Sequence, residues 1–141
     1  MKFFVYSRPA IERVPAHDVP HIVISITTTS DDRARIPESK EQRGLLRLSF
    51  PDADSVIPGY EERDLFSEIH ADAIWEFVLR HRADISRIAL HCDAGMSRSP
   101  GVAAALSKVL VGNDAQFFKR YHPNMRVYRT LLERYYEKFE R

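Results

Sequence analysis

The chain is short of cysteine and has no excess of charge of either sign. Among its 141 residues there is one cysteine, so no internal disulfide can form. That excludes a disulfide-stapled secreted domain and favours a reducing cytoplasm. The 21 Lys and Arg residues are matched by 20 Asp and Glu residues, which leaves a net charge of +1. This balance argues against a general binder of nucleic acid or of an anionic membrane.

Long hydrophobic runs and clustered metal ligands are also missing. No apolar run approaches the roughly 20 residues needed to cross a bilayer. The opening stretch MKFFVYSRPAIERV meets charge after a few apolar residues, so we expect no signal peptide. The six histidines are scattered along the chain, and we expect neither a metal nor a cofactor. The sequence therefore predicts one globular domain over residues 1–141, monomeric and cytoplasmic.

Short strand-like segments alternate with longer helix-like ones. β-branched and aromatic residues predict strands over 3–7, 21–28, 45–50 and 85–92. Apolar spacing and capping residues predict helices over 60–82, 99–111, 114–121 and 124–139. Strands separated by a helix favour parallel pairing. The predicted fold is α/β, with a central, mainly parallel sheet of four to five strands flanked by helices.

Two further expectations concern particular segments. In the helix predicted over 60–82, the apolar stripe consists of Leu65, Phe66, Ile69, Ala73, Ile74, Phe77 and Val78. Residues 29–44 are polar and predict a long surface loop. Whether this loop lines the rim of a site, through Arg33, Arg35 or Lys40, stays open.

The single cysteine lies in the stretch IALHCDAGMSRSPGVAAAL, residues 88–106. IAL is typical of a buried strand and GVAAALSKVLV of a helix, so residues 92–97 form a tight loop between them. Backbone N–H groups in the first turn of a helix lack partners, and the helix dipole adds positive charge there. Gly95 lets the loop amides converge on an anion, and Arg98 adds a planar fork of donors suited to phosphate oxygens. The pattern predicts a phosphate cradle with a thiol at its base.

The same electrostatic field favours the thiolate form of Cys92, which is the nucleophilic form. Ser99 is placed to donate a hydrogen bond to the sulfur when it acts as a leaving group. We expect His91 to point away from the thiol and to hydrogen-bond the loop backbone. A lone cysteine is most often a buried core residue. The whole pattern H-C-x-x-G-x-x-R-S, between a strand and a helix, makes the nucleophile the stronger interpretation.

HCDAGMSRS resembles the signature loop of the cysteine-dependent protein tyrosine phosphatases, especially their compact dual-specificity-like branch. The resemblance implies that Cys92 is the nucleophile. It also implies that phosphate is bound by Asp93, Ala94, Gly95, Met96, Ser97 and Arg98. RLSFPD is similar to that family's general-acid loop, and HPNMRVYRTLLERYY to its Pro-Asn helix start, so the likeness covers about residues 45–140. The low-molecular-weight phosphatases carry their Cys-x5-Arg loop near the amino terminus, and position 92 argues against that branch.

A general acid must protonate the leaving oxygen, and a carboxyl group supplies that proton. The segment FPDADSV offers Asp52 and Asp54. Asp52 occupies the family's Pro-Asp position and is favoured, while Asp54 stays open. Asp93 is expected to point outward and to put negative charge at the rim of the site.

The resemblance implies a metal-independent hydrolase that cleaves phosphate monoesters through a phosphocysteine. Its favoured substrate is protein phosphotyrosine, with phosphoserine and phosphothreonine also open, and a small phosphomonoester would serve as well. The alternatives are a catalytically weak phosphate-binding module and a phosphatase for a phosphoinositide or an RNA 5′-phosphate. The loop carries no lysine, which disfavours a highly anionic substrate. Cys92 and Asp52 are both present, which argues against a silent module.

Overall fold

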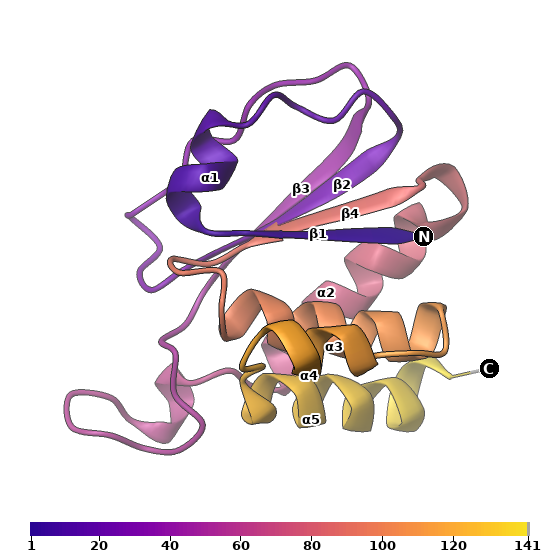
Figure 1. The fold of residues 1–141 in the computed structure, drawn as a ribbon. Coiled ribbons are helices and arrows are strands. Elements are labelled where there is room, and N and C mark those ends of the chain that lie inside the picture. Colours follow the sequence, from indigo (N-terminus) through magenta and orange to yellow (C-terminus); the bar gives the residue numbers. More distant parts are fainter. Residues whose placement is uncertain (141) are drawn as a thin grey trace.

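The computed structural model describes residues 1–140, and a four-stranded sheet forms its centre. The strands are β1 (Lys2–Tyr6), β2 (His21–Thr27), β3 (Gln42–Ser49) and β4 (Arg87–His91). They lie in the order β1-β4-β2-β3, and every neighbouring pair is parallel (Figure 1). Because parallel strands end at the same edge, the loops that follow β2, β3 and β4 gather at one end of the sheet.

Helices cover both faces of this sheet. Helix α1 (Arg8–Arg13) lies on one face (Figure 1). On the opposite side lie α2 (Glu68–His81), α3 (Arg98–Leu110), α4 (Ala115–Arg120) and α5 (Met125–Arg134), and α5 packs on α2 and α3 rather than on the sheet. Short 3-10 turns occur at Glu62–Asp64 and Arg82–Asp84, and a π-helical turn, Tyr135–Phe139, continues α5. Across residues 1–140, no helix has both the length and the apolar character that a membrane span requires.

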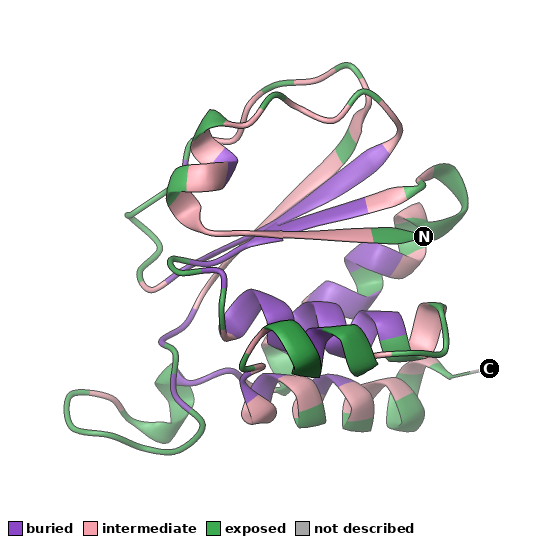
Figure 2. Ribbon diagram, viewed as in Figure 1, coloured by how far each residue is buried: buried purple, intermediate pink, exposed green. Residues whose placement is uncertain are grey.

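The main core lies between the sheet and helices α2 and α3, and it continues between those helices and α5 (Figure 2). All seven residues of β2 are buried, as expected for a strand covered on both faces. Helix α3 consists largely of small residues and is buried over most of its length. A Cβ atom at Gly101 would lie 2.9 Å from the Asn124 carbonyl oxygen, so this glycine lets α3 and the start of α5 approach closely.

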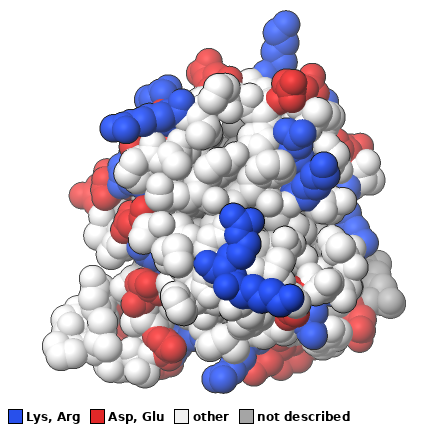
Figure 3. All heavy atoms as spheres, viewed as in Figure 1, with Lys and Arg blue, Asp and Glu red and all other residues white. Residues whose placement is uncertain are grey.

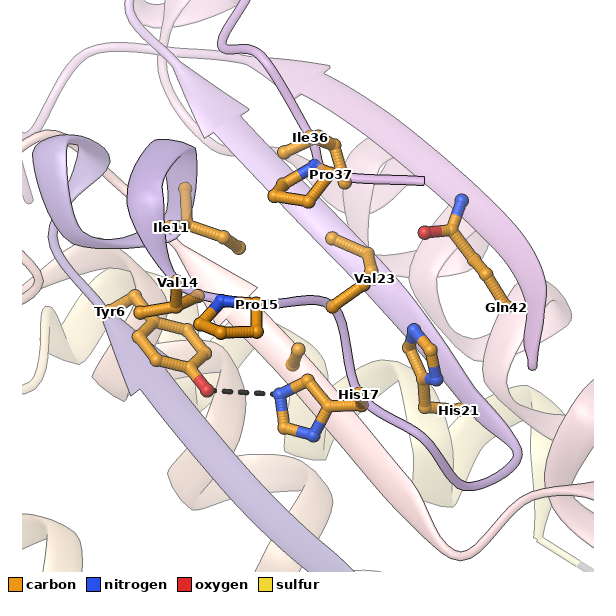
Figure 4. A pocket seen from close by; sticks show the side chains of 12 residues that line it. Tyr6, Ile11, Val14, Pro15, His17, His21, Val23, Ile36, Pro37 and Gln42 are labelled. Atoms are coloured by element: carbon orange, nitrogen blue, oxygen red, sulfur yellow. Dashed lines mark hydrogen bonds between the residues drawn. The ribbon is translucent and has the colours of Figure 1, made fainter. Parts of the chain in front are cut away.

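A smaller core lies on the other face, beneath α1. It contains Ile11, Val23 and Ala89, beside a narrow and mostly apolar cavity. In Figure 4 the Tyr6 hydroxyl points across this cavity to His17, and its oxygen lies 2.9 Å from His17 Nε2. Helix α1 therefore closes this face with a patch of apolar contacts and one polar pair.

The predicted fold class is confirmed, with shifts in the element ends. The helix predicted over 60–82 begins only at Glu68, after Ser67 and His70 form a reciprocal cap. The expectation that Ile69 belongs to the buried stripe is wrong, since its exposed fraction is 81%. Leu65 and Phe66 enter the core from the preceding segment, and Ala71, Ile74, Trp75 and Val78 set the buried face of the helix. Position 69 falls on the opposite side of a helix with that phase.

The predicted surface loop is also shorter than expected. Strand β3 begins at Gln42, so the last three residues of the 29–44 segment belong to the sheet. The pairing of His21 with Gln42 and of Ile22 with Gly44 places them there. Polar residues at this point are compatible with a strand because β3 lies at the edge of the sheet.

Candidate active site

The Cys92 loop, residues 92–98, joins β4 to α3 at the carboxyl edge of the sheet. Gly95 in this loop has a φ of +72°, which favours glycine. A Cβ atom there would lie 2.7 Å from the Ser7 backbone nitrogen, so the loop passes directly against the junction of β1 and α1. The same junction supports the loop, because the Arg8 N–H donates to the Asp93 carbonyl at 2.9 Å.

The thiol of Cys92 lies at the base of this loop. The residue is 2% exposed, and its Sγ lies 3.2 Å from Ser99 Oγ. His91 points away from the thiol. Its Nε2 lies 2.6 Å from Ser25 Oγ and its Nδ1 lies 3.2 Å from the Cys92 carbonyl oxygen.

The protonation state of His91 follows from its surroundings. Burial lowers the pKa of His91 below its usual value, so the imidazole is neutral at pH 7. The Cys92 carbonyl can only accept, so Nδ1 carries the proton and donates to it. Nε2 then accepts from the Ser25 hydroxyl. The histidine thereby fixes the backbone at Cys92 without exchanging a proton with the thiol.

Arg98 is held from three sides. Its Nη1 donates to the Phe50 carbonyl at 3.0 Å and to Thr28 Oγ1 at 3.1 Å, and its Nη2 donates to Asp93 at 2.9 Å. The guanidinium side chain is only 6% exposed. Its Nε is buried and has no hydrogen-bond partner anywhere in residues 1–140. An unsatisfied buried donor costs about 1–3 kcal/mol, and a phosphate oxygen in the loop would supply the missing acceptor.

Asp93 does not point away from the site. Its Oδ2 lies 2.9 Å from Arg98 Nη2 and 3.4 Å from Thr28 Oγ1, which corrects the expectation of an outward carboxylate. The side chain is 50% exposed, so its negative charge still reaches the rim. The cause is the buried guanidinium of Arg98, which attracts the nearest carboxylate because a charge out of water needs a partner.

Asp52 lies directly beside the Cys92 loop. Its Oδ1 accepts hydrogen bonds from Ser97 Oγ at 2.8 Å and from Asn124 Nδ2 at 2.9 Å. Asp54 is exposed, and none of its hydrogen bonds within residues 1–140 reaches the loop. The structure therefore brings Asp52, and not Asp54, against the cysteine loop.

The remaining loop residues form its outer wall. Ala94 and Met96 are exposed, while Ser97 is partly buried. The Met96 carbonyl accepts from the His122 N–H at 2.9 Å, and the Ser97 carbonyl accepts from the Asn124 N–H at 2.9 Å. The segment that leads into α5 thus fixes the backbone of the loop through two hydrogen bonds.

Several supporting residues were not identified from the sequence. Asn124 was expected only as a helix cap, and it does accept from the Val127 N–H at 3.1 Å while also binding Asp52. Thr28 and the Phe50 carbonyl hold Arg98, although both lie far from it in the sequence. The Pro-Asn step before α5 was the one local signal for Asn124. Thr28 and Phe50 carry no local signal, because their contacts arise from the order of the strands.

No protein-family model matches the chain, and neither does any curated protein. Solved structures do match. The chain is similar to human DUSP28 with 16% identity over 93% of this chain and 89% of that one, and a TM-score of 0.60. It is similar to the human tyrosine phosphatase-like serine/threonine/tyrosine-interacting protein with 18% identity over 96% and 90%, and a TM-score of 0.59.

A third similar structure is that of PTPMT1 in complex with PI(5)P, with 22% identity over 84% of this chain and 78% of that one, and a TM-score of 0.52. At these identities the likeness concerns the fold. It agrees with the resemblance that the loop HCDAGMSRS carries. The chain therefore has the dual-specificity phosphatase fold.

Proposed function

We propose that the chain is a phosphatase that hydrolyses phosphate monoesters through a phosphocysteine, with protein phosphotyrosine as its substrate. One observation carries this proposal. The thiol of Cys92 lies at the base of a loop where Arg98 keeps a buried Nε donor without a protein acceptor. An anion bound by that donor and by the loop amides would lie against the sulfur.

In the first step, the substrate phosphate binds to the loop amides and to Arg98. The Cys92 thiolate attacks phosphorus, and the bond from phosphorus to the ester oxygen breaks. Asp52 gives its proton to that oxygen, so the leaving group departs as a neutral alcohol or phenol. Both hydrogen bonds to Asp52 go to Oδ1, which leaves Oδ2 free to carry the proton.

In the second step, water attacks the phosphocysteine. Asp52, now a carboxylate, takes a proton from that water, and the sulfur–phosphorus bond breaks. Cys92 leaves as a thiolate, and the hydroxyl of Ser99, 3.2 Å from the sulfur, donates to it. The loop amides and Arg98 stabilise the charge on the transferring phosphoryl group in both steps.

The charge around the loop supports phosphotyrosine over more anionic substrates. Asp93 is half exposed at the rim, and the loop contains no lysine. On the face shown in Figure 3, basic and acidic side chains are interspersed over the surface. A phosphoinositide headgroup or an RNA 5′-phosphate would favour a continuous basic surround.

A phosphoinositide is nevertheless the second candidate, because one similar structure is a complex with PI(5)P. A third candidate is a phosphate-binding module of low activity, since another similar protein is named phosphatase-like and interacting. We further propose that residues 1–141 act as one monomeric domain in the cytoplasm, without metal or cofactor. Turnover that survives a chelator would support the absence of a metal, and analytical ultracentrifugation would test whether the chain is a monomer.

The experiment that separates these functions compares turnover of four substrates by the purified chain. They are a phosphotyrosine peptide, a phosphothreonine peptide, PI(5)P and an RNA 5′-phosphate, each with Cys92→Ser as the matched control. We expect the phosphotyrosine peptide to have the highest kcat/KM and the Cys92→Ser protein to be inactive. If the wild-type chain binds the phosphopeptide but turns over none of the four, the binding module is correct instead.

A further inference from the structure

A second cluster of cationic and hydroxyl side chains lies outside the Cys92 loop. It surrounds a cavity of about 120 Å³ between the ends of β2 and β3 and the segment that follows β2. Its walls are Ser25, Thr27, Ser30, Arg33, Arg47 and Ser49. We refer to it as the Arg33–Arg47 cavity. It shares no residue with the Cys92 loop.

The cavity lies on a face of the sheet where polar side chains are unusual. Ile22, Ile24 and Ile26 of β2 pack in the main core, so the alternate residues Ser25 and Thr27 face the side of α1. Ser25 pairs with Arg47, and Thr27 pairs with Ser49. Each of these β2 residues is 5% exposed or less. Ser25 and Thr27 are thus buried on a sheet face where apolar residues are the rule, and their half-buried neighbours Arg47 and Ser49 are polar as well.

The charges in the cavity are all of one sign. Two guanidinium groups, those of Arg33 and Arg47, line it, and no carboxylate does. Within residues 1–140, the Arg47 guanidinium makes one hydrogen bond, from Nη1 to the Ala34 carbonyl at 3.0 Å. The described part of the chain supplies the Arg33 side chain with no hydrogen bond and no ion pair. Both guanidinium groups therefore keep donors that the protein does not use.

Arg8, the next basic residue near the cavity, is different because two carboxylates pair with it. Its Nη1 lies 2.9 Å from Asp32 and its Nε lies 3.4 Å from Glu12. The pKa of Arg47 is lowered by burial and by repulsion from Arg33 and Arg8. A bound anion would relieve that repulsion.

Of the four hydroxyl groups in the cavity wall, three donate hydrogen bonds within the protein and one does not. Ser25 donates to His91, and Thr27 donates to the Thr29 carbonyl at 2.9 Å. Because the Thr27 hydrogen goes to Thr29, Ser49 donates to Thr27 Oγ1 at 3.3 Å, whereas Ser30 has no partner in residues 1–140. Ser30 is therefore free to donate alongside the two arginines. The two guanidinium groups can only donate and no carboxylate lines the cavity, so its wall favours an anion over a cation.

The size of the cavity indicates the size of the anion that it can hold. The cavity has a volume of about 120 Å³, which is enough for one tetrahedral oxyanion with water beside it. We propose that the Arg33–Arg47 cavity is a second anion site, which binds one inorganic oxyanion, phosphate or sulfate.

This second site lies beside the residues that accept hydrogen bonds from Arg98. Thr28 and Phe50, whose oxygens accept from Arg98, directly follow Thr27 and Ser49 in the chain. An oxyanion bound to Arg47, two residues before Ser49 on β3, would therefore stabilise the strand ends that position Arg98. The proposal itself concerns binding only and does not rest on the proposed phosphatase function.

Nuclear magnetic resonance of the arginine Nε–H groups tests this proposal directly. The labelled wild-type chain is titrated with orthophosphate and, in a separate arm, with sulfate. We expect the Arg33 and Arg47 resonances to shift together and to saturate with one Kd, and the two arms to rank the two anions. In Arg33→Gln the Kd read from Arg47 should rise about tenfold, as expected for loss of one charge-assisted hydrogen bond.

Arg43→Gln is the matched control. Arg43 lies on β3, as Arg47 does, but it pairs with Glu41 outside the cavity. It should leave the Kd unchanged, and unchanged melting temperatures without anion show that both variants fold. The Arg98 resonance reports phosphate at the Cys92 loop separately, so failure there would contradict the proposed function and not this site. Resonances of Arg33 and Arg47 that do not saturate, or a Kd unaltered in Arg33→Gln, would overturn the proposal.

Discussion

Asp52 and Ser97 join the two loops of the candidate active site, because Ser97 Oγ donates to Asp52 Oδ1 at 2.8 Å. Ser97 is the last residue of the turn before α3, and Asp52 follows β3 after Pro51. Asn124 adds a second donor to the same oxygen at 2.9 Å and caps α5 with its own side-chain oxygen. Asp52, the Cys92 loop and α5 are therefore positioned as one unit.

The assignment of the general acid predicts a dependence on the leaving group. Asp52→Asn should lower kcat/KM, which reports cleavage of the ester bond, by about 100-fold for an alkyl phosphate and much less for a nitrophenyl phosphate, because only a poor leaving group needs the proton. Steady-state rates for a series of aryl and alkyl phosphates measure this. Asp54→Asn is the matched control and should leave the series unchanged. If Asp54→Asn produced the effect and Asp52→Asn did not, the acid would be Asp54.

The three-sided anchoring of Arg98 predicts that its shape matters as well as its charge. Arg98→Lys keeps the charge but cannot reach Phe50, Thr28 and a phosphate oxygen at once. We expect kcat/KM for an aryl phosphate to fall more than about tenfold, or roughly 1.4 kcal/mol of transition-state stabilisation. The variant's melting temperature serves to separate this loss from unfolding. A smaller loss in a folded variant would mean that Arg98 is not the phosphate clamp.

The contact between Asp93 and Arg98 predicts an effect on anion affinity. Asp93→Asn removes the carboxylate that lies 2.9 Å from Nη2 and leaves the guanidinium charge unbalanced. Orthophosphate should then inhibit aryl phosphate turnover more strongly, with an inhibition constant about three to ten times lower, as expected for one partly exposed ion pair. Asp54→Asn again provides a charge-matched control. An unchanged or higher inhibition constant in Asp93→Asn would show that the ion pair does not compete with phosphate.

Burial of His91 predicts a loss of stability in mild acid. Its folded-state pKa is lowered, so below the unfolded value of about 6.5 the unfolded chain binds a proton that the folded chain does not. The free energy of unfolding should therefore fall as the pH drops below about 6.5, by up to roughly 1.4 kcal/mol per pH unit for each such histidine. Burial also lowers the pKa of His17 and of His70, which add to the slope.

Urea denaturation at pH 7.5 and 5.5 measures this slope. His91→Asn should reduce the difference between the two pH values by about the contribution of one histidine. His122→Asn, at an exposed position, should leave the difference as it is in the wild-type chain. An equal slope in His91→Asn and wild type would show that His91 is not held neutral by the fold.

Much of the fold follows from local sequence patterns. The β-branched run of β2 and the small residues of α3 predict a buried strand and a closely packed helix. The Cys92 loop is equally local, because a strand, a glycine, an arginine and a helix follow one another within a few residues. For the same reason Cys92, Ser99 and His91 lie close to their expected positions.

The features that were missed depend on contacts between distant segments, on the burial of a charged group, or on the residue at which a helix begins. Asn124 binds Asp52 across 72 positions of the chain, and no periodicity in the sequence reports that contact. Asp93 turns inward because Arg98 is buried, which only the packed structure reveals. Ile69 is exposed because the cap at Ser67 sets where α2 begins, and with it which face of the helix is buried.

The central claim is that Cys92 carries the phosphoryl group during turnover, and trapping that intermediate tests it most directly. Asp52→Asn should slow the hydrolysis step, so the protein is mixed with an aryl phosphate, quenched in acid and analysed by peptide mass spectrometry. We predict one phosphoryl group on the peptide that contains Cys92, and none in the Cys92→Ser protein treated in the same way. Turnover of the aryl phosphate by Cys92→Ser, or turnover in the wild-type chain with no phosphoryl group ever trapped on Cys92, would contradict the account.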